Sequence, residues 1–127
     1  MDFTLSDEIE RTRLQVREFV EQEVLPLETD AANFDDHENL KESVVAAVRE
    51  KAKAQGLWGF QLPKERGGRD LGIVGMAALY EEAARSPFGP VAFNCAPLDD
   101  GNMIVLNKIL SEAQKDRWLQ PIIDGKV

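Results

Sequence analysis

The chain has 127 residues, of which 43% are hydrophobic and 30% are charged, and its formal net charge is −8 at pH 7. These values are ordinary for one globular domain with a core of its own. The acidic excess repels phosphate backbones, so we expect no nucleic-acid partner. No apolar run is long enough to span a membrane. The single cysteine, Cys95, excludes an internal disulfide and favours an intracellular, cytoplasmic location.

The first predicted helix begins near Thr4 or Ser6. A capping-box pattern starts at Thr4, and the acidic residues that follow suit the positive end of a helix dipole. Apolar residues then recur on one face at helical spacing. Pro26 lacks an N–H group and clashes with the carbonyl four residues earlier. The helix is therefore predicted to kink or end near Val24 or Leu25.

A second helix is predicted to end near Gln55. Asp35 and Asp36 are its possible N-terminal caps. Gly56 suits the left-handed position that follows many helices, and the next residue, Leu57, supplies the accompanying apolar contact.

A turn-rich connection follows, and a third helix is predicted over about 74–85. Bulky apolar residues in the connection and on the inner helix faces are expected to form the core. Five of them are expected to be substantially buried: Phe19, Val48, Trp58, Phe60 and Leu79.

Helical periodicity breaks down between Ser86 and Met103, in the sequence SPFGPVAFNCAPLDDGNM. Long irregular connections inside compact helical domains are usually functional or disordered. The apolar residues of this stretch tend to be buried and argue against disorder. They are Phe88, Val91, Phe93, Cys95 and Leu98. We therefore predict that this central stretch forms the wall of a site.

Two further helices are predicted after the central stretch. Gly101 or Asn102 begins the fourth helix, and the capping box Ser111-x-x-Gln114 opens the last one, which Pro121 bends or ends. The sequence has no alternating strand pattern. The predicted fold class is an all-α bundle of five or six helices.

The sequence contains few side chains that could act in catalysis or bind a metal. A metal site needs several ligands at workable spacing, and the sequence offers none. The single histidine, His37, is expected to be an exposed loop residue. A Cys95–His37 pair is conceivable, although a buried, inert thiol is the favoured interpretation. Glu81 and Glu82 are neighbours on a helix and point apart, so we expect one exposed and one structural carboxylate.

Four segments resemble, in order and spacing, the N-terminal helical domain of the acyl-CoA dehydrogenase family. They are VREFVEQEVLP, AKAQGLWGFQLPKERGGRDLG, MAALYEEAARS and SEAQKDRWLQPIIDG. The stretch FNCAPLDDGNMIVL resembles one branch of the family, which includes animal dehydrogenases fused to kinase-like domains. That branch is associated with long-chain, branched or 4-hydroxy acyl-CoA substrates.

The resemblance implies an oxidoreductase that oxidises the Cα–Cβ bond of acyl-CoA thioesters. A glutamate base removes the α proton, FAD accepts the hydride, and an electron-transferring flavoprotein reoxidises the flavin. It also implies that a flavin-binding β domain and a C-terminal helical domain lie outside residues 1–127. This chain is then expected to be a fragment that is inactive alone, without catalytic, FAD-binding or metal-binding residues. The full-length form is expected to be a homo-oligomer.

The resemblance places one wall of the acyl pocket in the central stretch. The expected substrate-binding residues are Phe93, Asn94, Ala96, Gly101, Asn102 and Met103. For Phe93, plain core packing is an equal alternative, and for Asn94 a hydrogen bond to the loop backbone is favoured. A second hypothesis is a free-standing helical module that binds a partner protein through its apolar face. A reading frame that continues beyond Val127 into a β-rich segment would favour the dehydrogenase.

Overall fold

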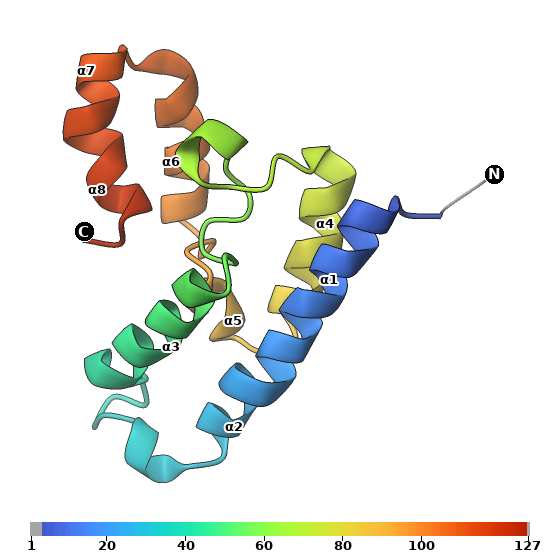
Figure 1. The fold of residues 1–127 in the computed structure, drawn as a ribbon. Coiled ribbons are helices and arrows are strands. Elements are labelled where there is room, and N and C mark those ends of the chain that lie inside the picture. Colours follow the sequence, from blue (N-terminus) through green and yellow to red (C-terminus); the bar gives the residue numbers. More distant parts are fainter. Residues whose placement is uncertain (1–3, 127) are drawn as a thin grey trace.

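A computed structural model describes residues 4–126 (Figure 1). Within this range the chain is helical and contains no β-strand, which confirms the all-α prediction. Consecutive helical turns join into six rods over these residues. The rods are α1 (Asp7–Phe19) continued by a π-helical turn (Val20–Val24) and α2 (Leu25–Glu28); α3 (Glu42–Ala54); α4 (Gly72–Ala83); α5 (Gly89–Ala92); α6 (Asp99–Ile109); and α7 (Glu112–Gln114) continued by a π-helical turn (Lys115–Leu119) and α8 (Gln120–Ile123).

Both long rods that contain a proline widen into a π-helical turn just before it. The first such turn ends at Val24, two residues before Pro26, and the second ends at Leu119, two residues before Pro121. A wider turn moves the preceding carbonyl away from the proline ring and leaves no α-helical hydrogen bond for the missing N–H. The helix does not end near Val24: it passes through the π-helical turn and continues to Glu28.

The predicted start of the second helix is wrong. The Asp35 carboxylate accepts hydrogen bonds from the backbone N–H groups of His37 and Asn39, at 2.8 and 3.0 Å, and so caps a turn. Helix α3 begins only at Glu42. Its predicted end is confirmed, because Gly56 adopts a φ of 66° and closes the left-handed cap.

The main core lies where α1, α3, α4 and α5 meet. In Figure 1, α1 and α4 run side by side along one edge of the molecule. Phe93 lies at the centre, with its ring 5.1 Å from that of Phe19 and 5.7 Å from that of Phe60. Phe19, Val48, Phe60 and Leu79 are buried as predicted, whereas Trp58 is only partly buried.

A smaller core holds α6 against the α7–α8 rod, at the opposite end from α1 (Figure 1). It is formed by Leu62, Met103, Leu119 and Ile123, all of which are buried. Trp58 closes the seam from the α3 side, because its indole N–H donates to the Ile123 carbonyl at 2.6 Å.

The central stretch differs from its prediction in two respects. It contains the short helix α5, and α6 begins at Asp99, earlier than the predicted Gly101 or Asn102. Leu98, expected to be buried, has 82% of its surface exposed. Its φ of 83° turns the chain sharply into α6, which directs the side chain outward. No helix within residues 4–126 is long and apolar enough to span a bilayer.

Candidate functional site

Asn94 ties the central stretch to two other parts of the chain. Its side-chain amide donates to the carbonyls of Ile122 and Ile123, at 3.1 and 3.4 Å. Its backbone carbonyl accepts from the Gln61 side chain at 2.8 Å, and its φ is 58°. These bonds hold the central stretch between the 57–71 connection and α8. The Asn94 amide is therefore engaged with the backbone of α8, and not with the loop backbone that the sequence favoured as its partner.

The residues predicted to line the acyl pocket divide by burial. Phe93 and Met103 are fully buried inside the chain's own core, and Ala96 is half-buried. Gly101 and Asn102 are exposed on the first turns of α6. Of the six predicted residues, only Gly101 and Asn102 are exposed, whereas Phe93 lies in the main core and Met103 in the smaller one.

An exposed, largely apolar face runs along α6. Five exposed residues lie along α6 and at its N-cap. The four within α6 recur three or four positions apart, which places them on one side of the helix, and Leu98 stands just before it. The five are Leu98, Gly101, Asn102, Val105 and Ile109, and we call them the α6 stripe. Leu98, Val105 and Ile109 expose 82%, 53% and 69% of their surfaces. The sequence analysis did not assign Val105 and Ile109 to the site, although their spacing is visible in the sequence.

A groove of about 440 Å³ adjoins α6 on another side. Leu62, Met76 and Ile104 form its apolar lining, and Asp70 and Lys108 also line it. Helix α6 thus has one face in the small core, one on this groove and one exposed as the α6 stripe. The last two are surfaces on which an apolar ligand or another part of a protein can pack.

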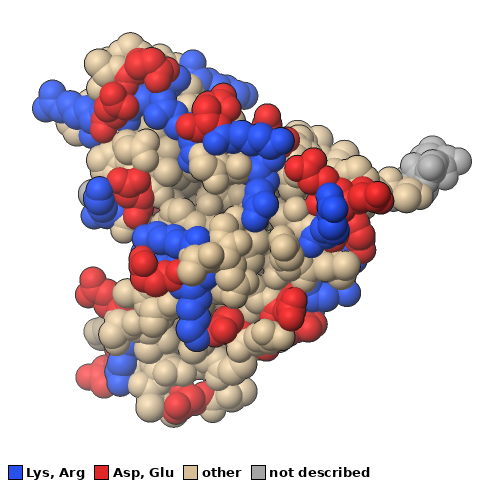
Figure 2. All heavy atoms as spheres, viewed as in Figure 1, with Lys and Arg blue, Asp and Glu red and all other residues tan. Residues whose placement is uncertain are grey.

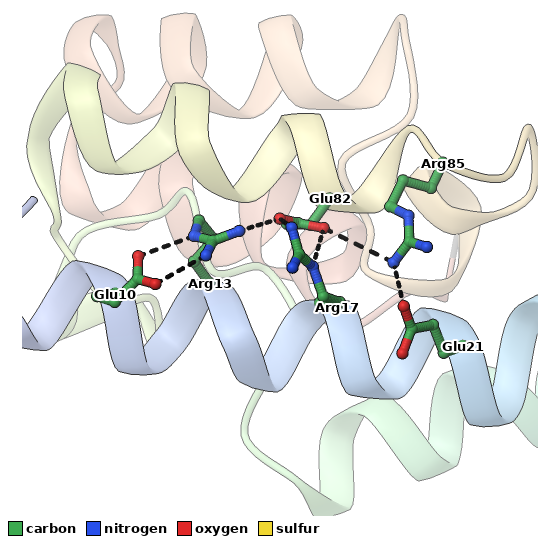
Figure 3. Close-up of polar contacts among 6 residues, drawn as sticks. All are labelled: Glu10, Arg13, Arg17, Glu21, Glu82 and Arg85. Atoms are coloured by element: carbon green, nitrogen blue, oxygen red, sulfur yellow. Dashed lines mark hydrogen bonds and ion pairs between the residues drawn. The ribbon is translucent and has the colours of Figure 1, made fainter.

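A network of charged residues joins α1 to α4 (Figure 3). The Glu82 side chain is only 4% exposed and accepts hydrogen bonds from Arg13 and from Arg17, whose Nη2 lies 2.7 Å from Oε1. Arg85 lies 3.9 Å from the same carboxylate and pairs with Glu21 at 2.6 Å. The network therefore fastens the two helices together.

Glu82 is unsuited to accept a proton. The hydrogen bond from Arg17, followed by that from Arg13, lowers the pKa of this carboxyl despite its burial. The neighbouring Glu81 is exposed. The pair thus consists of one structural and one exposed carboxylate, which confirms the prediction.

The Cys95 thiol is also unreactive. Cys95 is buried, and burial raises the pKa of its thiol to about 12, so it stays protonated. His37 is exposed in the turn before α3. Residues 4–126 contain no cluster of three or more groups that could hold a metal ion.

The flavin implied by the sequence resemblance does not fit the glycine-rich loop of this chain. A Cβ atom on Gly68 would lie 1.8 Å from the Leu62 carbonyl oxygen, so the loop packs against its own backbone. Gly67 adopts a φ of 86° to make this turn. Figure 2 shows acidic and basic side chains interspersed over the visible face, without a basic patch to receive phosphates. We assign no flavin contact to this loop.

Comparison with known proteins gives a consistent result. The model of the family "Acyl-CoA dehydrogenase, N-terminal domain" matches residues 6–126. The chain is 37% identical over 120 residues to acyl-CoA dehydrogenase family member 11 from Gallus gallus, covering 90% of this chain and 15% of that protein. It is 34% identical over 130 residues to family member 10 from Mus musculus, covering 97% of this chain and 12% of that protein.

A solved structure extends the comparison to the fold. A Mycobacterium abscessus protein assigned to the acyl-CoA dehydrogenases superimposes with a TM-score of 0.84 and 33% identity, covering 98% of this chain and 33% of that one. The chain thus spans a third or less of the length of these relatives. The family match covers nearly every residue, and the structural match agrees with it. The chain belongs to the acyl-CoA dehydrogenase N-terminal domain family.

Proposed function

We propose that this chain covers the acyl side of the substrate pocket in a flavin-dependent acyl-CoA dehydrogenase. The observation that carries the proposal is the α6 stripe, an exposed and largely apolar face on the helix that follows the central stretch. An apolar wall suits an acyl chain, because binding pockets for such groups are mostly apolar. A free-standing interaction module would use the same face, but membership of the family favours the dehydrogenase.

The chemistry belongs, in this proposal, to parts of the protein outside this chain. FAD would accept the hydride there, beside a glutamate base, and an electron-transferring flavoprotein would take up the electrons. The whole enzyme would be a cytoplasmic homo-oligomer. This chain contributes exclusion of water and a surface that limits acyl length, which are the usual contributions of a protein to cofactor chemistry.

The proposed pocket-lining residues are Phe93, Asn94, Ala96, Gly101, Asn102 and Met103, of which the first and last are buried within this chain. We further propose the branch that takes long-chain, branched or 4-hydroxy acyl-CoA. The resemblance of the stretch FNCAPLDDGNMIVL to that branch supports this proposal. On the α6 stripe, Asn102 is the exposed amide, whereas the Asn94 amide is already bonded to α8.

The test is an acyl-length scan in a dehydrogenase that contains this chain. Asn102→Trp adds bulk to the α6 stripe and should lower kcat/KM for long acyl-CoA by about tenfold or more, with little effect on short ones. Glu18→Trp, which adds the same bulk to an exposed position on α1, should change neither. Equal kcat/KM losses at every acyl length in Asn102→Trp would refute the pocket assignment.

A further inference from the structure

A hydrogen bond between two helices connects the core to the start of α6. The Tyr80 hydroxyl, on α4, donates to Oδ2 of Asp100 at 2.8 Å. The Tyr80 ring packs against Phe60 with a centroid distance of 5.6 Å, so the core fixes the position of the hydroxyl. Asp100 lies in the first turn of α6, directly before Gly101 and Asn102.

The bond is important because Asp100 has few partners. Its other carboxylate oxygen, Oδ1, is buried and has no hydrogen-bond partner among residues 4–126. A buried carboxylate oxygen without a hydrogen bond costs free energy. The bond from Tyr80 is therefore important for keeping this carboxylate in place. Loss of the Tyr80 hydroxyl would leave the carboxylate with a strong tendency to move towards water.

The protonation states of the surrounding groups suit this arrangement. Burial, and then the hydrogen bond to Asp100, raise the pKa of Tyr80, so the phenol keeps the proton that it donates. Burial, and then the charge of Asp100, raise the pKa of Cys95, so the nearby thiol stays neutral. Tyr80 is therefore a permanent donor at physiological pH.

We propose that Tyr80 is a positioning residue for the acyl pocket: through Asp100 it fixes the first turn of α6 and thereby the position of the α6 stripe. This inference rests on the proposed function, because the stripe matters for selectivity only if it faces an acyl chain. Tyr80 itself is 20 residues from Asp100 in sequence and lies on α4, outside the stripe.

Amide hydrogen exchange on this chain tests the structural half. In Tyr80→Phe, which retains the ring and its contact with Phe60, the amides of Asn102 and Met103 should exchange roughly tenfold faster. The amides of α3 should be unchanged. Unchanged exchange at Asn102 would overturn the inference.

Variants of the two neighbouring aspartates supply matched controls. Asp100→Ala should accelerate exchange as Tyr80→Phe does, whereas Asp99→Ala, at an exposed position in the same turn, should not. Asp100→Asn keeps an oxygen that can accept from Tyr80 and should restore most of the protection. Equal effects of Asp99→Ala and Asp100→Ala would assign the result to the helix dipole and overturn the inference.

Acyl selectivity in a dehydrogenase that contains this chain tests the functional half. Tyr80→Phe should change the ratio of kcat/KM between long and short acyl-CoA by about threefold or more. Equal loss at every length, in parallel with a lower melting temperature, would show a purely structural role and overturn it. If no acyl-CoA reduces even the unmodified protein, the proposed function fails, while the exchange data still decide whether Tyr80 fixes α6.

Discussion

Glu81 and Glu82, although adjacent on α4, lie in opposite surroundings. Glu82 is buried between the guanidinium groups of Arg13 and Arg17, whereas Glu81 is exposed. A buried carboxylate is tolerable only because these charged donors replace its water. The network therefore stabilises the packing of α1 against α4.

Replacing Glu82 tests that conclusion. Glu82→Gln should lower the free energy of unfolding at pH 7 by about 1–3 kcal/mol, because charge-assisted hydrogen bonds to two arginines are weakened. Urea unfolding measures the change, and Glu81→Gln, at the exposed neighbour, should have almost no effect. Comparable losses of stability in both variants would contradict the role of Glu82 in holding α1 against α4.

The same pair of variants predicts a pH dependence. The folded-state pKa of Glu82 is lowered, so its contribution is complete above its ordinary pKa and is lost as the pH falls through the folded value. The stability difference between the unmodified chain and Glu82→Gln should therefore shrink below about pH 4. A difference that stays constant down to pH 2 would contradict the ion pairing.

The burial of a residue was predictable where it depended only on which face of a helix the residue occupies. Phe19, Val48 and Leu79 follow helical spacing and are buried. Leu98 does not follow this rule, because its exposure is set by a positive φ that no local pattern announces. The Tyr80–Asp100 bond joins two helices and could not be predicted from either helix alone.

Element boundaries were less predictable than element types. Asp35 is a residue type that often caps helices, but here it caps a turn. Leu40 pairs with Phe34 in an isolated bridge, so α3 begins only after this pairing. That pairing depends on contacts beyond one helical turn. By contrast, the Ser111-x-x-Gln114 capping box and the cap at Gly56 are satisfied locally and were predicted correctly.

Alanine substitutions at two glycines are expected to change stability in opposite directions. Gly125 has a φ of 71°, and a Cβ there would lie 2.7 Å from the Trp58 ring. Gly125→Ala should therefore cost about 1–3 kcal/mol by strain and by disturbing the contact between α8 and Trp58. Gly101, within α6, has open space around it. Gly101→Ala should raise stability by about 0.5–1 kcal/mol, and thermal unfolding measures both.

A loss of stability in Gly101→Ala would show that α6 is not a free helix face at this position. A neutral Gly125→Ala would show that the seam between Trp58 and α8 tolerates movement.

At the scale of the whole molecule, the isolated chain exposes an apolar face that it cannot cover. We expect weak self-association and binding of a dye for apolar surfaces through the α6 stripe. The double variant Val105→Ser, Ile109→Ser should reduce both, whereas Leu14→Ser, an exposed apolar position on α1, should not. Sedimentation velocity measures the association. A clean monomer at high concentration, without dye binding, would contradict this expectation.

Acyl-CoA-dependent reduction of flavin tests the central claim most directly. A purified protein that contains this chain together with its flavin-binding part should be bleached by acyl-CoA and should pass electrons to a dye. The isolated chain of 127 residues, assayed under the same conditions, should bind no FAD and reduce no dye, because the proposal assigns the flavin site and the glutamate base to other parts of the protein. A yellow, active preparation of the isolated chain would contradict the account, as would a complete flavoprotein that no acyl-CoA reduces.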